Sequence, residues 1–209
     1  MVDFTFLWAA FLGIFAIVNP FSTAVVFLSI TAGDREKKKR AMAKKASLVC
    51  ACVLIFFMFS GTVLFDFFGL SLQAFQLAGG LLVAKLGFSM IESKSQLKEK
   101  ERQESLRKED VSIIPLAIPM LSGPGAITTA MVWMSQAAGP YEKFGLVLIA
   151  ILISVISYIV LLNAKYLKNA LGHTGVNVLE KLMGLIVLVM GIQFLINGLV
   201  DLNVLDLAE

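Results

Sequence analysis

Long uncharged stretches dominate the pattern of this sequence. Charged residues occur in short clusters, and between clusters the chain stays apolar over lengths close to the roughly 20 residues that span a bilayer core. Six such stretches predict six transmembrane helices: Phe4 to Gly33, Ala46 to Phe65, Phe67 to Ala84, Val111 to Tyr141, Phe144 to Ala164 and Leu182 to Val200. We expect the third helix to continue to Ile91, because the stem of Lys85 can carry its charge to the interface.

The composition supports this pattern. Of the 209 residues, 58% are hydrophobic and 16% are charged, against about 45–50% and 25% in soluble domains. An ordinary soluble enzyme is therefore excluded, and the fold class is an all-α polytopic membrane protein. None of the six stretches contains Asp, Glu or His, so we expect no enzymatic activity, no catalytic residue, no metal site and no cofactor.

The basic residues predict the orientation in the membrane. Lys and Arg gather in the loops after the first, third and fifth stretches, whereas the other loops and both ends are mainly acidic. Basic loops are retained in the cytoplasm, so both termini should lie outside it. The formal net charge of +3 then reflects topology and contact with anionic headgroups. The lipid bilayer is a partner, and nucleic acid is not expected.

An internal repeat divides the chain into halves. Three residue pairs share an offset of 104 positions: Pro20 and Pro124, Gly80 and Gly184, Gly87 and Gly191. Each half contains three helices, an odd number, so the second half enters the membrane in the opposite direction. Inverted repeats are typical of secondary transporters. The alternative is a duplication that made a stable six-helix bundle without transport.

The repeat also defines the domain organisation. We expect a single transmembrane domain over residues 1–209, with repeat one at 1–92, a cytoplasmic connector at 93–110 and repeat two at 111–209.

The first and fourth stretches contain a predicted break. They are 30 and 31 residues long, more than one span requires, and each carries a proline near its middle. Asn19 precedes Pro20, and Ser122 and Gly123 precede Pro124. A capping residue followed by proline is typical of a helix start. Helices 1 and 4 should therefore be discontinuous, with a second half-helix beginning inside the membrane.

These breaks predict a binding site. Irregular backbone at this depth must line protein or a cavity, and a half-helix N-terminus favours an anionic group. The nearby side chains are neutral, which suits a small zwitterion, and Phe21 can limit the room. The alternative for the hydroxyls is helix packing. The predicted substrate-binding residues are Asn19, Pro20, Phe21, Ser22, Thr23, Ser122, Gly123, Pro124, Gly125 and Thr128.

Two further polar residues lie within the predicted spans. Lys85 is the only ionisable residue well inside one. It either reaches the interface with its charge or acts in gating or coupling, and in the second case Lys85→Met would impair transport. Gln193 in the sixth helix is a weaker candidate for the same role.

The sequence resembles the MarC family of bacterial and archaeal inner-membrane proteins. The similarity covers nearly the whole chain. It rests on three segments: Asn19-Pro20 with Phe27-Leu28-Ser29, Ile114 to Pro119 leading to Gly123 to Ile127, and Gly175 to Gly184. The resemblance implies a multi-pass protein of the cytoplasmic (inner) membrane that transports small neutral amino acids such as glycine and alanine. The chain departs from the family at Phe21 and Ser22, where an aliphatic residue and glycine are usual.

Taken together, the sequence predicts a secondary transporter that works by alternating access. No G-x-x-x-x-G-K-[ST] loop for ATP is present, whereas coupling to Na+ or H+ fits a site built from backbone carbonyls. The alternative function is an exporter or flippase of amphipathic or lipid-linked solutes, including drugs. The exact substrate, the coupling ion, the direction of transport and the oligomeric state are left open, and a homo-oligomer is compatible with the sequence.

Overall fold

A computed structural model describes residues 4–31, 34–69, 71–92 and 121–202. Within these ranges all regular structure is helical, which confirms the all-α class. The helices are α1 (Phe4–Val18), α2 (Pro20–Ile30), α3 (Glu36–Phe68), α4 (Leu72–Glu92), α6 (Pro124–Gln136), α7 (Pro140–Leu162) and α8 (Ala164–Val200).

Five segments of the described residues are long and apolar enough to cross a membrane. They are Phe4–Leu28, Glu36–Gly61, Leu72–Glu92, Pro140–Leu162 and Asn177–Val200. These segments match the predicted first, second, third, fifth and sixth helices. The beginning of the predicted fourth helix and the predicted connector at 93–110 lie outside the described residues.

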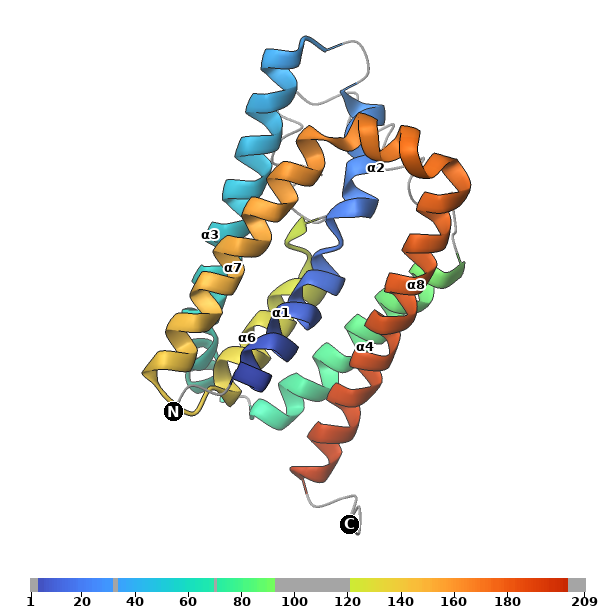
Figure 1. Cartoon of the computed structure of the whole chain (residues 1–209). Coiled ribbons are helices and arrows are strands. Elements are labelled where there is room, and N and C mark those ends of the chain that lie inside the picture. Colours follow the sequence, from blue (N-terminus) through green and yellow to red (C-terminus); the bar gives the residue numbers. More distant parts are fainter. Residues whose placement is uncertain (1–3, 32–33, 70, 93–120, 203–209) are drawn as a thin grey trace.

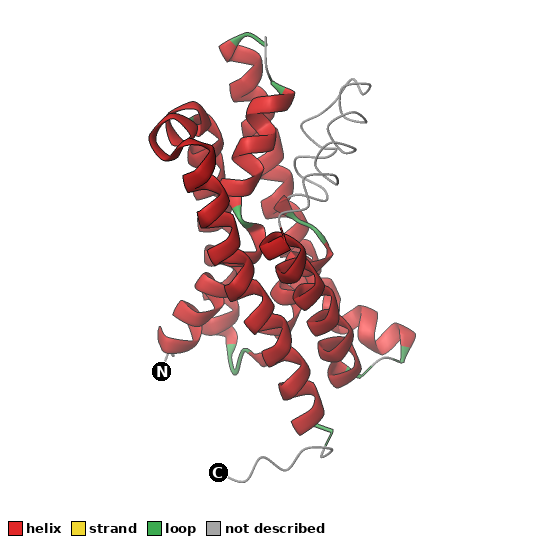
Figure 2. Ribbon diagram, turned by 90° about the vertical axis from the view of Figure 1, so that its right-hand side faces the viewer, coloured by secondary structure: helices red, strands yellow, loops and turns green. Residues whose placement is uncertain are grey.

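The helices form an upright bundle in which α1 and α6 lie in the middle (Figure 1). Helices α3 and α7 pack together on one side, and α4 and α8 pack together on the other. The start of α1 and the end of α8 are at the same end of the bundle. The turned view in Figure 2 shows the same upright arrangement from the side.

Glycines bring α4 and α8 into backbone contact. A Cβ atom at Gly80 would lie 2.8 Å from the carbonyl oxygen of Gly191, and one at Gly87 would lie 2.7 Å from that of Gly184. No larger residue fits at these positions unless the helices separate.

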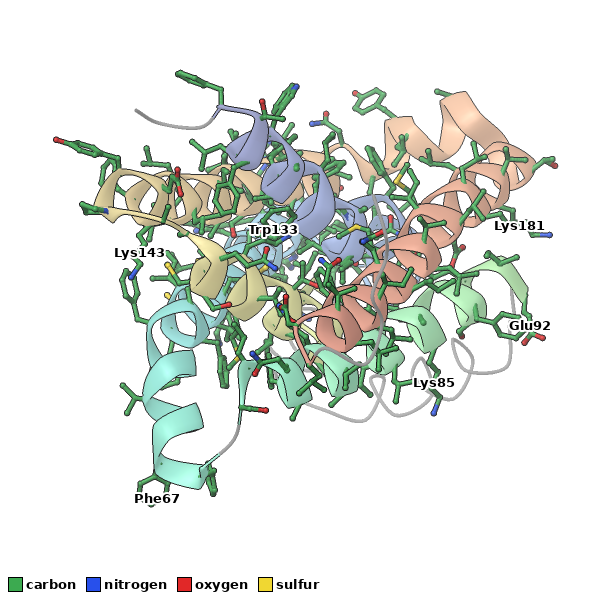
Figure 3. The ribbon with its side chains drawn as sticks, turned by 90° about the horizontal axis from the view of Figure 1, so that it is seen from below. Phe67, Lys85, Glu92, Trp133, Lys143 and Lys181 are labelled. Atoms are coloured by element: carbon green, nitrogen blue, oxygen red, sulfur yellow. The ribbon has the colours of Figure 1, made fainter. Side chains whose placement is uncertain are left out.

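The outer surface of the bundle is apolar. Large hydrophobic side chains are exposed on α1, α3, α4, α7 and α8, as expected of a surface that faces lipid. On α3 the exposed residues recur at helical spacing and form one stripe: Leu48, Phe56, Phe59, Val63 and Phe67. Phe67 lies at the outer tip of α3 in Figure 3.

Some helix boundaries differ from the prediction. The third helix does pass Lys85 as expected and ends at Glu92. However, α8 begins at Ala164 rather than at Leu182, so the predicted loop before the sixth helix is itself helical. The prediction missed this helical segment because it took each helix to end at the nearest charged residue. A helix that lies outside the hydrocarbon core can carry charged side chains without an energetic cost.

A bend in α8 explains how this extra helix is accommodated. Gly172 has φ 63° and ψ −178°, outside the helical region and within the left-handed half that favours glycine. The part of α8 before Gly172 crosses the top of the bundle in Figure 1, and the part after it descends beside α4.

Candidate functional site at two helix breaks

The first break lies between α1 and α2. Asn19 has φ 41° and ψ 67°, and it is the only non-glycine residue with positive φ among those described. Its Oδ1 accepts a hydrogen bond from the Ser22 backbone N–H at 3.3 Å, and Pro20 occupies the first helical position. The prediction that α2 begins with an asparagine cap followed by proline is confirmed. Asparagine is among the few residues that tolerate the left-handed conformation.

The second predicted break ends where α6 begins, and the half-helix expected before it lies outside the described residues. Pro124 again occupies the first helical position, and Gly123 is the cap with φ −71° and ψ 173°. Gly123 has no side chain, so this cap residue makes no side-chain hydrogen bond to the start of α6. Ser122 is fully buried and lies directly before the Gly123 cap.

The two breaks lie next to each other. A Cβ atom at Gly125, in the first turn of α6, would lie 3.4 Å from Cγ2 of Ile17, two residues before Asn19. Figure 1 shows the start of α6 beside the gap between α1 and α2. Two proline-begun helices therefore have their N-termini at one place in the bundle.

The other predicted site residues divide into three environments. Pro20 and Thr23 are buried at the first break, where the Thr23 hydroxyl donates to the Asn19 carbonyl at 3.4 Å. Phe21 is half-buried, and its ring packs edge-on against Phe15 at 5.9 Å. Pro124 is exposed. These residues surround the breaks, although Pro124 faces out of the packed interior.

Thr128 belongs to a helix contact instead. It is 5% exposed, and its methyl group occupies the space beside Gly79 of α4. For this hydroxyl residue the observed contact matches the helix-packing alternative. Its neighbour Thr129 is fully buried, and its hydroxyl has no hydrogen-bond partner among the described residues.

Further unpartnered polar atoms lie in the bundle interior. They include Oε1 of Gln76 on α4 and Nε1 of Trp133 on α6, together with the hydroxyls of Ser47 and Ser60 on α3. Trp133 lies near the centre of the view along the bundle (Figure 3) and one turn from Thr129. Buried polar atoms normally find a partner, and water or a ligand supplies it when the protein does not. These atoms add polar character to the core of α3, α4 and α6.

Lys85 and Gln193 are not brought to the breaks. Both side chains are exposed, and Lys85 points away from the bundle in Figure 3. Gln193 donates to Asn197 Oδ1 at 2.8 Å along the same face of α8.

Glu180 is a site residue that sequence reasoning missed. It lies on α8, is 7% exposed, and accepts a hydrogen bond from the Ser22 hydroxyl at 3.2 Å. The sequence does carry a signal for this position. Glu180 lies two residues before the predicted start of the helix and one turn before the first of a series of buried α8 residues at helical spacing: Gly184, Val187, Gly191, Phe194 and Gly198.

Comparison with known proteins agrees with this architecture. Residues 4–203 match the family described as MarC family integral membrane protein. The chain is 35% identical over 201 residues to a UPF0056 membrane protein of Methanocaldococcus jannaschii, covering 95% of this chain and 98% of the relative. It is 39% identical over 190 residues to one of Pyrococcus abyssi, covering 90% and 92%.

A bacterial relative shows the same extent of similarity. The UPF0056 membrane protein YhcE of Escherichia coli is 32% identical over 200 residues, covering 94% of this chain and 93% of the relative. The names of these relatives indicate membrane proteins and no enzymatic activity. No solved structure matches the chain. The family match spans nearly the whole length of an all-helical, multi-pass chain, and the protein therefore belongs to the MarC family of integral membrane proteins.

Proposed function

We propose that this protein is a secondary transporter of small neutral amino acids of the glycine and alanine type. The observation that carries the proposal is the meeting of two proline-begun helices, α2 and α6, at one place in a membrane-embedded bundle. Broken helices whose N-termini converge are a recurring way to hold an anionic group within a membrane.

The chemistry of the breaks suits a small zwitterion. The first-turn N–H groups of a helix have no partner within the helix, and the cap residue of α6, Gly123, has no side chain to bond them. A substrate carboxylate can accept from these groups. The site has little room, because Gly125 is buried against Ile17 and Phe21 closes on Phe15. A small side chain fits best.

The glycine contacts support the proposed inverted repeats of three helices each, six in all. Gly80 meets Gly191, and Gly87 meets Gly184. By the offset of 104 positions, Gly80 corresponds to Gly184 and Gly191 corresponds to Gly87, so exchanging the two halves turns the first pair into the second. A two-fold axis produces this reciprocity, and an axis in the membrane plane would allow one half to rock against the other about the site.

We also propose the orientation that the basic residues predict. The start of α3, rich in lysine, and the bend of α8 lie at the end of the bundle opposite the start of α1. With basic segments in the cytoplasm, both termini lie outside it, in the inner membrane of a bacterium or archaeon.

Counterflow in proteoliposomes tests the proposal. Vesicles that hold purified protein and unlabelled glycine should accumulate radiolabelled glycine or alanine from outside, without any ion gradient. Imposed sodium and pH gradients then identify the coupling ion. Absence of counterflow from a monodisperse preparation contradicts the proposal. Movement of a fluorescent lipid or an amphipathic drug by the same vesicles would instead support an exporter or flippase.

Lys85 is expected to be dispensable for counterflow. Its side chain is exposed and directed away from the two breaks, so its charge reaches the interface without facing substrate. Lys85→Met should keep the wild-type glycine counterflow rate within about twofold. A loss of counterflow at normal protein level would contradict this expectation and give Lys85 a role in gating or coupling.

A further inference from the structure

We propose that Gln76 and Thr129 bind water inside the membrane, on the outer part of the route by which substrate reaches the two breaks. Outer means the half of the bundle between the breaks and the end at which α1 begins. The inference rests on the proposed function and deepens it, because it gives the substrate a route to the site.

The contact between α4 and α6 has a regular register. A Cβ atom at Gly125 would lie 3.4 Å from Cδ2 of Leu86 and 3.6 Å from Cγ2 of Val83. Further along α6, the methyl group of Thr128 fills the space beside Gly79. The two helices are therefore antiparallel, and Figure 1 shows that α4 begins and α6 ends at the end of the bundle where α1 begins.

Gln76 is the next residue on this face of α4. It lies three positions before Gly79 and seven before Val83, a spacing that keeps all three on one side of a helix. It is 1% exposed. Gln76 therefore faces the part of α6 beyond Thr128, where Thr129 is fully buried. The contact of Thr128 with Gly79 lies between this polar pair and the breaks.

The Thr129 hydroxyl differs from other buried hydroxyls of the bundle. Those of Thr31, Ser154 and Ser157 each donate to the carbonyl four residues earlier, at 2.7, 2.9 and 2.8 Å. Such a bond satisfies a hydroxyl within its own helix. The Thr129 hydroxyl has no hydrogen-bond partner in the described part of the chain, so it lacks this internal solution.

The unpartnered atoms around Thr129 include both an acceptor and a donor. Oε1 of Gln76 accepts, and Nε1 of Trp133, one turn from Thr129 on α6, donates. This nitrogen would lie 3.3 Å from a Cβ atom at Gly13, so the donor is next to α1. A buried water molecule makes two to four hydrogen bonds to groups of this kind. Within a membrane, unsatisfied polar atoms are strongly unfavourable.

The surroundings favour water over an ion. Neither α6 nor the part of α4 from Leu72 to Ala84 contains a charged residue. A cation held by protein needs a full shell of oxygen ligands, and a charge within the membrane is usually paired with another. Water needs neither. Water along this face gives a polar substrate a route through the apolar half of the bundle.

Thiol labelling of the protein in lipid nanodiscs tests for water at the two positions. Gln76→Cys and Thr129→Cys should react with a small cationic methanethiosulfonate at least about tenfold faster than Ala150→Cys, because a thiol reacts as its thiolate, which apolar surroundings disfavour. Ala150 is the matched dry control, since it is also fully buried but lies on α7.

Two further proteins calibrate the labelling. Gln136→Cys places a thiol at the exposed end of α6 and should react fastest, which shows that the reagent is active. The wild type measures the background from its native thiols, buried Cys50 and exposed Cys52.

Counterflow tests whether the water lies on the substrate route. Gln76→Leu removes the amide at similar volume and should lower the glycine counterflow rate at least about tenfold. It should not destabilise the protein, because the amide oxygen has no partner to lose within the described residues. Gln193→Leu changes an exposed glutamine of α8 and should keep the wild-type rate. A packing role of Gln76 would instead lower the temperature at which the variant loses monodispersity.

The outcomes separate the inference from the proposed function. Absence of counterflow by the wild type overturns the proposed function, whichever positions are labelled. Labelling of Gln76→Cys and Thr129→Cys at the rate of Ala150→Cys overturns the water site, even when the wild type shows counterflow. Fast labelling together with full counterflow by Gln76→Leu overturns the route. If the Gln76 variants fail to fold, the labelling rate of Thr129→Cys decides, because cysteine is close to threonine in size.

Discussion

Asn19→Ala is expected to reduce glycine counterflow to background while the protein remains folded in the membrane. Alanine cannot accept the hydrogen bond from the Ser22 N–H, and loss of such a cap costs about 0.5–2 kcal/mol. Alanine also disfavours the left-handed conformation that Asn19 adopts at φ 41°, by about 1–2 kcal/mol. Both costs fall on the break that would position the substrate in the proposed function, so the site should lose its shape.

Asn19→Gly separates these two contributions. Glycine adopts positive φ readily and costs only a few tenths of a kcal/mol as a cap, so the path of the backbone should survive. We expect this variant to regain part of the counterflow. The measurement is the initial rate of labelled glycine entry, normalised to protein recovered by size-exclusion chromatography. Wild-type rates for both variants would mean that the first break does not form the binding site.

Gly87→Ala should destabilise the protein by at least about 3 kcal/mol, at the upper end of what overpacking usually costs. The added Cβ would collide with the backbone of α8 at Leu188 and Gly184. Backbone atoms cannot rotate away as a side chain can, so the helices must separate along their length. Gly191→Ala should have a similar effect, since its Cβ would collide with the backbone of Ala84.

The control is Gly139→Ala. Gly139 caps α7 in an extended conformation and has nothing within 4 Å of an added Cβ, so the variant should behave as the wild type. The readout is the fraction of detergent-solubilised protein that stays monodisperse after heating across a temperature series. If Gly87→Ala lost monodispersity at the same temperature as the Gly139→Ala control, this result would contradict the backbone contact between α4 and α8.

The periodic features of this chain could be predicted from sequence. The length of the apolar stretches identified the candidate spans. Proline after asparagine identified the start of α2, because proline lacks a backbone N–H donor and has a fixed φ, which permit few other arrangements. Each of these features depends on short-range geometry that a sequence carries directly.

The contact between Ser22 and Glu180 could not be predicted in the same way. The two residues are 158 positions apart, and their meeting depends on the bend at Gly172 and on how α8 descends past α2. The charge pattern also placed Glu180 in a loop, because a glutamate followed by a lysine is typical of a loop at the membrane surface. Tertiary packing decides that Glu180 is buried, and the number of charges along the sequence gives no information about that packing.

The reciprocal glycine contacts have a consequence for the origin of the chain. In the proposed inverted repeats, Gly80 with Gly191 and Gly87 with Gly184 are contacts that one surface would make with a copy of itself in the opposite orientation. An ancestor of half this length would already have carried a complete, self-complementary interface. Fusion of two copies would preserve that interface and make its formation independent of protein concentration. Once joined, each half would be free to acquire residues that the other lacks, and Glu180, at the position equivalent to Gln76 by the offset of 104, would be an example.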